Sequence, residues 1–335
     1  MLLFGKKRLS NIVEISIVAP LYNEEFNINY LFERLFSVLN RLDMRYEIVC
    51  VNDGSKDNTL GCLIEHHHQN PAIKVVNLSR NFGKEIALTA GIDYAIGSAI
   101  VPIDADLQDP PELIEKLVTK WREGYDVVYA MRRSRRGESW LKRFTANAFY
   151  RAIANMSRVP IPRNTGDFRL LDRRVVEVLK QMPERSRFMK GLFAWVGYKQ
   201  TSILYNRSPR YKGKTKWNYW RLWNFAVDGI TSFSLVPLKI WGYIGLVLSL
   251  LAFLYATFLV IRTLLFGIDV PGYASLMVAM LFLGGVQLVT LGIIGEYIGR
   301  VYEEVKQRPL YLVREFYGFA IDSKESEEMS FSIRK

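Results

Sequence analysis

The sequence is poor in cysteine and histidine, which limits the chemistry it can support. Of its 335 residues only two are cysteines, Cys50 and Cys62, and only three are histidines. So few cysteines exclude a disulfide framework and fit a reducing compartment. Cys50 lies in an apolar run and is most simply a small core residue. The histidines are adjacent at 66–68, shortly before Pro71, which indicates an exposed helix end more than a metal site.

Two nucleotide-binding glycine motifs are also missing. No GxGxxG follows the first predicted strand and no GxxxxGK[ST] occurs, so a dinucleotide-binding Rossmann site and a P-loop are excluded.

Acidic residues are fewer than basic ones. The chain has 33 Asp and Glu against 45 Lys and Arg, which gives a net charge of +12. This excess suits an anionic partner: nucleic acid, a phosphorylated substrate or an acidic membrane surface. The N-terminal MLLFGKKRLSNIVE does not have the order of a secretory signal, so we expect the N-terminal part to stay in the cytoplasm.

Uncharged runs long enough to cross a bilayer occur only near the C-terminus. Residues 240–261 and 270–295 form runs of 22 and 26 residues without a charge, and about 20 apolar residues suffice for a membrane-spanning helix. A pair of buried core helices is the alternative. The loop FGIDVPGY between the runs has no Lys or Arg, whereas Lys239 and Arg300 lie on the outer flanks. The positive-inside rule therefore predicts two spans with both termini in the cytoplasm.

The segment before these runs is rich in aromatic residues. In residues 214–236, Trp217, Trp220 and Trp223 alternate with Lys216 and Arg221, a pattern typical of an amphipathic helix in the membrane interface. A core helix of the soluble part is the alternative. We therefore predict four parts: a catalytic domain at 1–213, interfacial helices at 214–236, two transmembrane helices at 237–301, and a cytoplasmic segment at 302–335 with a disordered tail.

The first 200 or so residues alternate apolar runs typical of strands with segments of helical periodicity. EISIVAP, EIVCVND, AIKVVNLS, SAIVPIDA and DVVYAMR read as strands, with helical patterns between them. This order predicts an α/β domain with a mostly parallel sheet, whose ligands bind beyond the carboxyl ends of the strands. Polar side chains follow every predicted strand, and these exits together predict one continuous site.

The fourth predicted strand runs directly into carboxylates in VPIDADLQDPPEL. Asp104, Asp106 and Asp109 lie within six positions, and carboxylates that close raise one another's pKa unless a cation separates them. Hard divalent cations take oxygen ligands, and magnesium is typically bound by one or two carboxylates plus substrate phosphates. The Asp-Ala-Asp triplet therefore predicts a metal site. Asp109 precedes two prolines and a predicted helix, so capping that helix is at least as good an interpretation for it.

Several motifs together resemble one known family. PLYNEE, VNDGS, DAD and LQDPP resemble the inverting family 2 glycosyltransferases of GT-A fold. SRNFGKE, NTGDFRL, RSPRYKGKTKW and the two apolar runs extend the resemblance to polyisoprenyl-phosphate glycosyltransferases, over roughly residues 14–315. Membrane-anchored bactoprenol glucosyltransferases are the most similar branch, and dolichyl-phosphate mannose synthases are related.

The resemblance implies inverting transfer of one sugar, with glucose favoured, from a UDP-sugar to a polyisoprenyl phosphate at the cytoplasmic membrane face. It implies a divalent ion, Mg²⁺ or Mn²⁺, at Asp104, Asp106 and Gln108. It also implies a donor site that includes Pro20, Tyr22, Glu24, Asp53, Lys84, Asp104, Arg210 and Lys216. The catalytic residues it implies are Asp167, Asp106, Arg132 and Arg143, with the two arginines on the acceptor phosphate.

Other functions remain alternatives from the sequence. A processive family 2 polysaccharide synthase would need more spans and a QxxRW motif, which is absent. A basic protein that binds nucleic acid or lipid without catalysis would leave the carboxylates at the strand exits unexplained. The same transfer with another sugar also stays open. We expect membrane lipids as partners, no nucleic acid, and a homotetramer.

Overall fold

The computed structural model describes residues 13–133, 165–182, 189–206, 236–266 and 272–319, with residues 162, 184, 185 and 187 between them. Its centre is a sheet of eight strands in the order β7-β5-β6-β4-β1-β2-β3-β8. The strands are β1 (Ile15–Leu21), β2 (Tyr46–Asn52), β3 (Ile73–Leu78), β4 (Ala99–Pro102), β5 (Val127–Arg132), β6 (Thr165–Asp172), β7 (Gln200–Tyr205) and β8 (Val313–Tyr317). Only β6 and β8 run antiparallel to their neighbours, which confirms the predicted mostly parallel α/β sheet.

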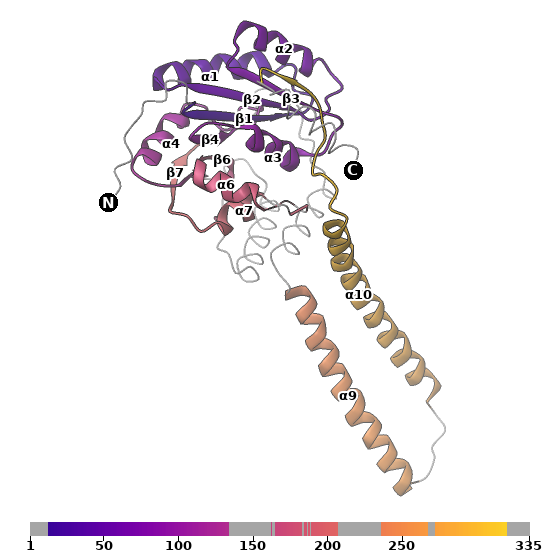
Figure 1. Cartoon of the computed structure of the whole chain (residues 1–335). Coiled ribbons are helices and arrows are strands. Elements are labelled where there is room, and N and C mark those ends of the chain that lie inside the picture. The colour runs from indigo at the N-terminus through magenta and orange to yellow at the C-terminus, as the bar shows by residue number, and fades with distance from the viewer. Residues whose placement is uncertain are drawn as a thin grey trace, which may run out of the picture.

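Helices cover both faces of this sheet (Figure 1). The helices of the domain are α1 (Ile28–Leu42), α2 (Thr59–Gln69), α3 (Lys84–Tyr94), α4 (Leu113–Arg122), α6 (Arg173–Lys180) and α7 (Met189–Trp195). One apolar cluster joins α1, α2 and α4 to one face, and a second joins α3, α6 and α7 to the other. Successive strand residues divide between the clusters: Ile48 and Cys50 belong to the first, Val49 and Val51 to the second. This alternation is the two-residue period of a strand buried on both faces.

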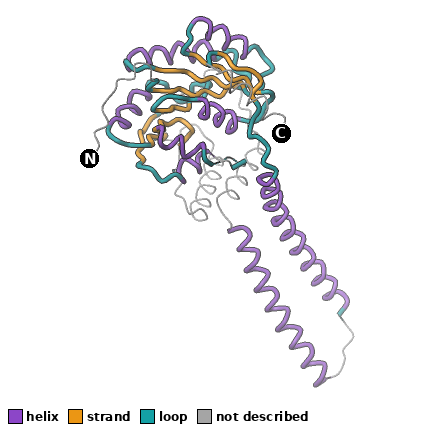
Figure 2. Tube along the Cα trace, in the orientation of Figure 1, coloured by secondary structure: helices purple, strands orange, loops and turns teal. Residues whose placement is uncertain are grey.

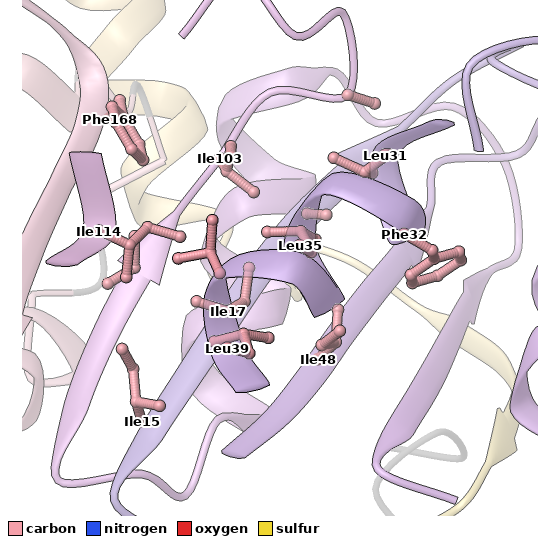
Figure 3. Close-up of a cluster of buried hydrophobic side chains, with 14 of the residues drawn as sticks. Ile15, Ile17, Leu31, Phe32, Leu35, Leu39, Ile48, Ile103, Ile114 and Phe168 are labelled. Carbon is pink, nitrogen blue, oxygen red and sulfur yellow. The ribbon is translucent and has the colours of Figure 1, made fainter. Parts of the chain in front are cut away.

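Helix α1 shows how the pattern of apolar residues produces the first cluster. Its buried residues are Ile28, Leu31, Phe32, Leu35, Val38 and Leu39. Their three- and four-residue spacing places them on one side of the helix. Figure 3 shows Leu31, Leu35 and Leu39 in one buried cluster with Ile17 and Ile48 of the sheet. The helix ends at Leu42, and the next residue, Asp43, has a left-handed φ of 48° that stops the helical repeat.

Two long helices extend away from the sheet domain (Figure 1). They are α9 (Val236–Phe266), which contains the first apolar run, and α10 (Tyr273–Val305), which begins three residues after the start of the second run and continues beyond its end. Within the described residues, the stretch Phe282–Val305 is long and apolar enough to cross a bilayer, and Tyr243–Tyr255 is a shorter apolar stretch. Large apolar side chains on both helices are exposed, including Phe266 at 82% and Leu288 at 71%. The two spans and their membrane topology therefore stay predictions, and α10 contains the stretch that meets the length and composition of a span.

The chain returns from α10 to the sheet (Figure 2). Residues 306–312 lead into β8, which pairs antiparallel with β3 so that Val313 lies opposite Leu78. Ser79 N–H donates to the carbonyl of Leu312 at 2.9 Å. The chain thus arrives from α10 at the carboxyl end of β3. Seven residues span at most about 25 Å, so the end of α10 lies within that distance of this edge of the sheet.

Sequence patterns missed three of these strands and misassigned one cap. β6, β7 and β8 were not predicted, and β8 shows that part of the C-terminal segment is ordered on the sheet. Helix α4 begins at Leu113 after Glu112, so the proposed capping role of Asp109 is wrong. Both cysteines are free, and Cys50 is fully buried, as predicted. The interfacial helix predicted at 214–236, except for residue 236, and the tail 321–335 lie outside the described residues.

Candidate active site

The topology of the sheet gathers seven strands at one edge. β1, β2, β3, β4, β5 and β7 point the same way, so their carboxyl ends share this edge. β6 runs antiparallel to β4 and β5, so its first residues, Thr165 to Asp167, begin at the same edge. The exits that the sequence predicted as one site therefore do lie together. Asp167 joins them because its strand runs in the opposite direction.

The loop after β4 presents its polar residues on one side. Ala105 and Leu107 are buried in the first apolar cluster, whereas Asp104, Asp106 and Gln108 are partly exposed. Leu107 has a left-handed φ of 56°, a backbone conformation that non-glycine residues adopt at a cost of about 1–3 kcal/mol. Its burial offsets that cost. The alternating pattern directs the three predicted metal ligands away from the core.

Lys84 links two carboxylates across this edge. It is the first residue of α3, and its Nζ lies 2.7 Å from Oδ2 of Asp104 and 2.7 Å from Oδ2 of Asp167. The side chain of Asp167 is 10% exposed, that of Asp104 is 30% exposed, and that of Lys84 is 42% exposed. One ammonium group thus holds together carboxylates from two strands, next to solvent.

The charges in this cluster shift one another's protonation. Burial by itself would raise the pKa of Asp167, but the ammonium groups of Lys84 and Lys190 outweigh it and hold that pKa well below its usual range. Burial and the charge of Asp167 raise the pKa of Asp104, although Lys84 opposes them. Burial lowers the pKa of Lys84, but Asp104 and Asp167 raise it further, so the lysine remains charged. Asp167 is therefore an ionised carboxylate, unsuited to act as a proton donor.

Asp104 and Asp106 fit a divalent cation that is completed by a substrate. Their carboxylates are two residues apart on one side of a loop, and hard cations prefer such oxygen ligands. Asp106 Oδ1 accepts from the backbone N–H of Gln108 at 3.2 Å, which holds the loop closed. Among the residues that the structure describes, no group of three or more His, Cys, Asp or Glu is arranged to hold an ion. Beyond these two carboxylates and the predicted ligand Gln108, the metal ligands would have to come from a diphosphate and water.

Asp53 ties the loops after β2 and β3 together. Its carboxylate accepts from the backbone N–H groups of Phe82 at 2.7 Å and Gly83 at 3.0 Å, and the residue is 2% exposed. Burial raises its pKa, and these two N–H groups oppose that effect. A Cβ at Gly54 would lie 2.5 Å from the carbonyl carbon of Arg80, so only glycine fits this close approach at φ 63°. Asp53 thus shapes the loop that delivers Lys84.

Hydrogen bonds also join the loop after β1 to the loop after β2. Asn23, at φ 53°, donates its N–H to Ser55 Oγ at 3.0 Å and accepts from the N–H of Lys56 at 2.8 Å. Glu24 N–H donates to Thr59 Oγ1 at 2.9 Å, and its Oε2 accepts from Asn27 at 2.6 Å. Pro20 pairs with Val51 inside the sheet and is partly exposed, as is Tyr22. The predicted nucleoside-binding residues therefore lie on one braced pair of loops.

Arg132 lies at the end of β5, directly opposite Tyr205 at the end of β7. Its Nε donates to the Tyr205 hydroxyl at 3.3 Å, and that hydroxyl donates to Oδ1 of Asp109. Asp109 is 3% exposed, so its carboxylate serves this buried contact instead of a helix cap. Arg143, Arg210 and Lys216 lie outside the described residues, and their predicted roles stay predictions.

A further buried group of charges lies behind Asp167, and the motifs that contain Glu85 and Arg169 did not indicate that these residues meet. Glu85 is in the first turn of α3, and the Met189 N–H donates to its carboxylate. Arg169 is 4% exposed on β6, with its guanidinium 4.0 Å from the centre of the Phe193 ring. Glu85 Oε2, Asp167 Oδ1 and Arg169 Nε are buried without a hydrogen-bond partner. A helical acid and a strand arginine give no local signal that they meet.

Glu85 makes stability depend on pH. Burial, with Asp167 adding to it, raises the pKa of Glu85 to about 7, and Lys84 and Lys190 oppose the shift. Because the folded pKa exceeds that of the unfolded chain, the folded state binds more protons in the window between them. Stability then falls as pH rises from about 4.5 to about 7 and is level above it. We expect Glu85→Gln to increase the free energy of unfolding at pH 8, by up to about 3 kcal/mol, and much less at pH 4.5.

Denaturant unfolding at both pH values measures this difference. The matched control is Glu123→Gln, because Glu123 is exposed and pairs with Lys120 at 2.8 Å. An equal effect of Glu85→Gln at the two pH values would contradict the raised pKa.

Comparison with known proteins adds two matched families and close relatives. Residues 16–180 match the model "Glycosyl transferase family 2", and residues 236–301 match "GtrB C-terminal hairpin". An uncharacterized glycosyltransferase of Synechocystis sp. is 67% identical over 91% of this chain and 96% of its own length. A prophage bactoprenol glucosyl transferase homolog of Escherichia coli K12 is 47% identical over 90% of this chain and 99% of its own.

Solved structures are more distant. Glucosyl-3-phosphoglycerate synthase from Mycobacterium tuberculosis, in a complex with Mn²⁺, UDP-Glc and phosphoglyceric acid, is 20% identical with a TM-score of 0.46. The match covers 65% of this chain and 78% of that one. A TM-score below 0.5 is too low to support an argument about the site. The relationship rests on the two family models and on the two sequence relatives.

Proposed function

The chain belongs to glycosyltransferase family 2, in the branch with the GtrB hairpin, and from this premise we propose that it transfers a single sugar from a UDP-sugar to a polyisoprenyl phosphate. The transfer inverts the anomeric centre and releases UDP. Glucose is the proposed sugar, because relatives at 47% identity carry the name bactoprenol glucosyl transferase.

One observation carries this proposal. The edge of the sheet that bears Asp104, Lys84 and Asp167 is also the edge at which the chain returns from α10. A lipid phosphate has its charged group at the membrane surface and its chain in the bilayer. A charged site that a short connection joins to the apolar helix α10 suits such an acceptor better than a soluble one (Figure 1).

The acceptor's chemistry requires cations more than a base. A phosphate oxyanion is already nucleophilic at neutral pH, so no group has to remove a proton from it. In the proposal Arg132 and Arg143 bind that phosphate through their guanidinium forks. Asp167, held ionised beside Lys84, orients the reacting groups. Pro20, Tyr22, Glu24 and Asp53 line the nucleoside pocket.

The donor's diphosphate is handled by cations as well. Asp104, Asp106 and Gln108 would hold Mg²⁺ or Mn²⁺, which neutralises charge that develops on the leaving diphosphate. Lys84 contacts Asp104, one of the proposed metal ligands, and would add a second positive charge beside the diphosphate. Arg210 and Lys216 are proposed to complete the donor site.

The proposed location is the cytoplasmic face of the plasma membrane. Helices α9 and α10 would form two spans with both chain termini in the cytoplasm, and residues 214–236 would lie in the interface. The exposed apolar side chains of both helices support this placement, since contact with water would be unfavourable for them. Homotetramers are proposed, and nucleic acid is not a partner.

A donor and acceptor assay tests the function. The purified full chain is incubated with undecaprenyl phosphate, Mn²⁺ and radiolabelled UDP-glucose, with UDP-galactose, UDP-N-acetylglucosamine, GDP-mannose and dTDP-glucose in parallel. We expect label in an organic-soluble product that mild acid releases, and none when the acceptor is omitted. Label in long polymer instead would support a processive synthase and contradict the proposal.

A further inference from the structure

A buried hydrogen-bonded chain lies behind Arg132, and its members come from three parts of the sequence. Asp109 belongs to the loop after β4, Tyr205 ends β7, and Arg132 ends β5. The Tyr205 hydroxyl donates to Asp109 and accepts from Arg132 Nε at 3.3 Å. A backbone hydrogen bond also joins the ends of β5 and β7, because the N–H of Arg133 donates to the carbonyl of Tyr205 at 2.9 Å.

We propose that Asp109 and Tyr205 are positioning residues that orient the Arg132 guanidinium for the acceptor phosphate. This inference rests on the proposed function, since it assigns a role in binding that acceptor. The two residues touch no substrate in the proposal and act through Arg132.

Burial makes this chain rigid. Asp109 is 3% exposed and Tyr205 is 5% exposed, and Tyr205 belongs to the apolar cluster beneath α1 and α4. Burial and the neighbouring Asp109 charge raise the pKa of Tyr205 to about 12. The hydroxyl therefore stays protonated and donates a hydrogen bond to Asp109. Because the hydroxyl proton is directed to Asp109, the hydroxyl oxygen can accept from Nε of Arg132, and this contact fixes the position of that Nε.

The guanidinium of Arg132 also lies near the start of β6. Its Nη1 and Nη2 carry the four N–H donors other than the Nε–H that donates to Tyr205. A Cβ at Gly166 would lie 3.6 Å from Arg132 Nη2 and 3.7 Å from Asp109 Oδ2. Gly166 immediately precedes Asp167, so the guanidinium lies beside the strand that carries the carboxylate proposed to orient the reacting groups.

A neutral tyrosine lies between the two charges along this chain. Its hydroxyl transmits the position of Asp109 to Nε of Arg132, so the contact holds the arginine without placing another charge beside the site.

Tyr205→Phe tests the inference because it removes only the hydroxyl. We expect the apparent KM for undecaprenyl phosphate to rise about tenfold, as for the loss of a hydrogen bond to a charged group. The apparent KM for the UDP-sugar should stay within about twofold, since the donor loops are not touched. Asp109→Asn should also raise the apparent KM for undecaprenyl phosphate and leave that for the UDP-sugar unchanged. The rise should be smaller, because an amide oxygen still accepts from the tyrosine.

Tyr311→Phe is the matched control. Tyr311 also donates to a largely buried aspartate, Asp93, at 2.9 Å, but this pair joins the chain after α10 to α3. Its loss should leave both KM values within about twofold of wild type. Equal effects of Tyr205→Phe and Tyr311→Phe on the acceptor KM would overturn the inference, as would a rise in the donor KM alone.

A double-mutant cycle separates positioning from general loss of structure. If Tyr205 acts through Arg132, then Tyr205→Phe in an Arg132→Lys background should change the acceptor KM by less than about twofold. Additive effects would overturn the inference while the proposed function stands. If the wild-type chain transfers no sugar to undecaprenyl phosphate, the proposed function fails first.

Discussion

Asp104→Asn is expected to lower sugar transfer by about a hundredfold to a thousandfold, a loss typical of removing one group that stabilises transition-state charge. Asp104 is at the exit of β4, on the same side of its loop as Asp106, and the described residues supply no third acidic side chain to replace it as a metal ligand. The amide keeps the size of the side chain but removes its charge. Initial rates with saturating Mn²⁺ and UDP-glucose measure the loss.

The matched control for this variant lies at the opposite edge of the sheet. Asp126 precedes β5 and pairs with Arg174 at 2.6 Å, so Asp126→Asn also neutralises a carboxylate that has a cationic partner. We expect Asp126→Asn to keep at least about half of the wild-type rate, because it is remote from the site. Titration of Mn²⁺ in the presence of UDP, followed by the loss of the free-ion EPR signal, should show weaker binding only for Asp104→Asn. Full transfer activity in Asp104→Asn would rule out the metal assignment.

Lys84→Met is expected to have two opposite effects. Transfer should fall about a hundredfold, since a cation beside the diphosphate is lost. Binding of Mn²⁺ without nucleotide should become about fivefold tighter, because the ammonium no longer competes for Oδ2 of Asp104 and a partly exposed ion pair is worth about 1 kcal/mol. The two carboxylates left behind, Asp104 and Asp167, would also repel each other until a cation binds.

Lys74→Met serves as its control. Lys74 pairs with Glu47 at 2.7 Å in the sheet, and its side chain is 17% exposed. It lies near the start of β3, away from the edge that carries the site. Neither the transfer rate nor Mn²⁺ binding should change by more than about twofold. Weaker Mn²⁺ binding in Lys84→Met would show that the lysine assists the ion instead of competing with it.

Much of the fold could be read from the sequence because it depends on local periodicity. Five strands, the helices between them and the two long apolar helices follow from spacing and from the absence of charge. The predicted strand exits do meet at one edge, because parallel strands place their carboxyl ends together. Strands β6, β7 and β8 were missed because their sequences, TGDFRLLD, QTSILY and VREFY, contain polar residues in place of a continuous apolar run.

The candidate site also combines residues that local motifs indicate with contacts between residues far apart in the sequence. Asp104 and Asp106 could be proposed from a triplet of adjacent residues, and Lys84 from a motif. The link between Lys84 and Asp167 spans 83 positions, and the contact between Asp109 and Tyr205 spans 96. Asp109 was misinterpreted because two prolines after an aspartate are a local capping signal, whereas its actual partner is a tyrosine on a strand that no local pattern predicted.

The sequence by itself determined which residues stand at the strand exits, which runs are apolar enough for a bilayer, and that the chain has the motifs of a sugar-transferring family. These properties follow from neighbouring residues and from the periods of strand and helix. Only the tertiary structure decided that β6 runs antiparallel and delivers Asp167, that Lys84 bridges Asp104 and Asp167, and that Asp109 supports Arg132 through Tyr205. Those contacts depend on packing between distant segments, where burial and charge select partners that local sequence cannot specify.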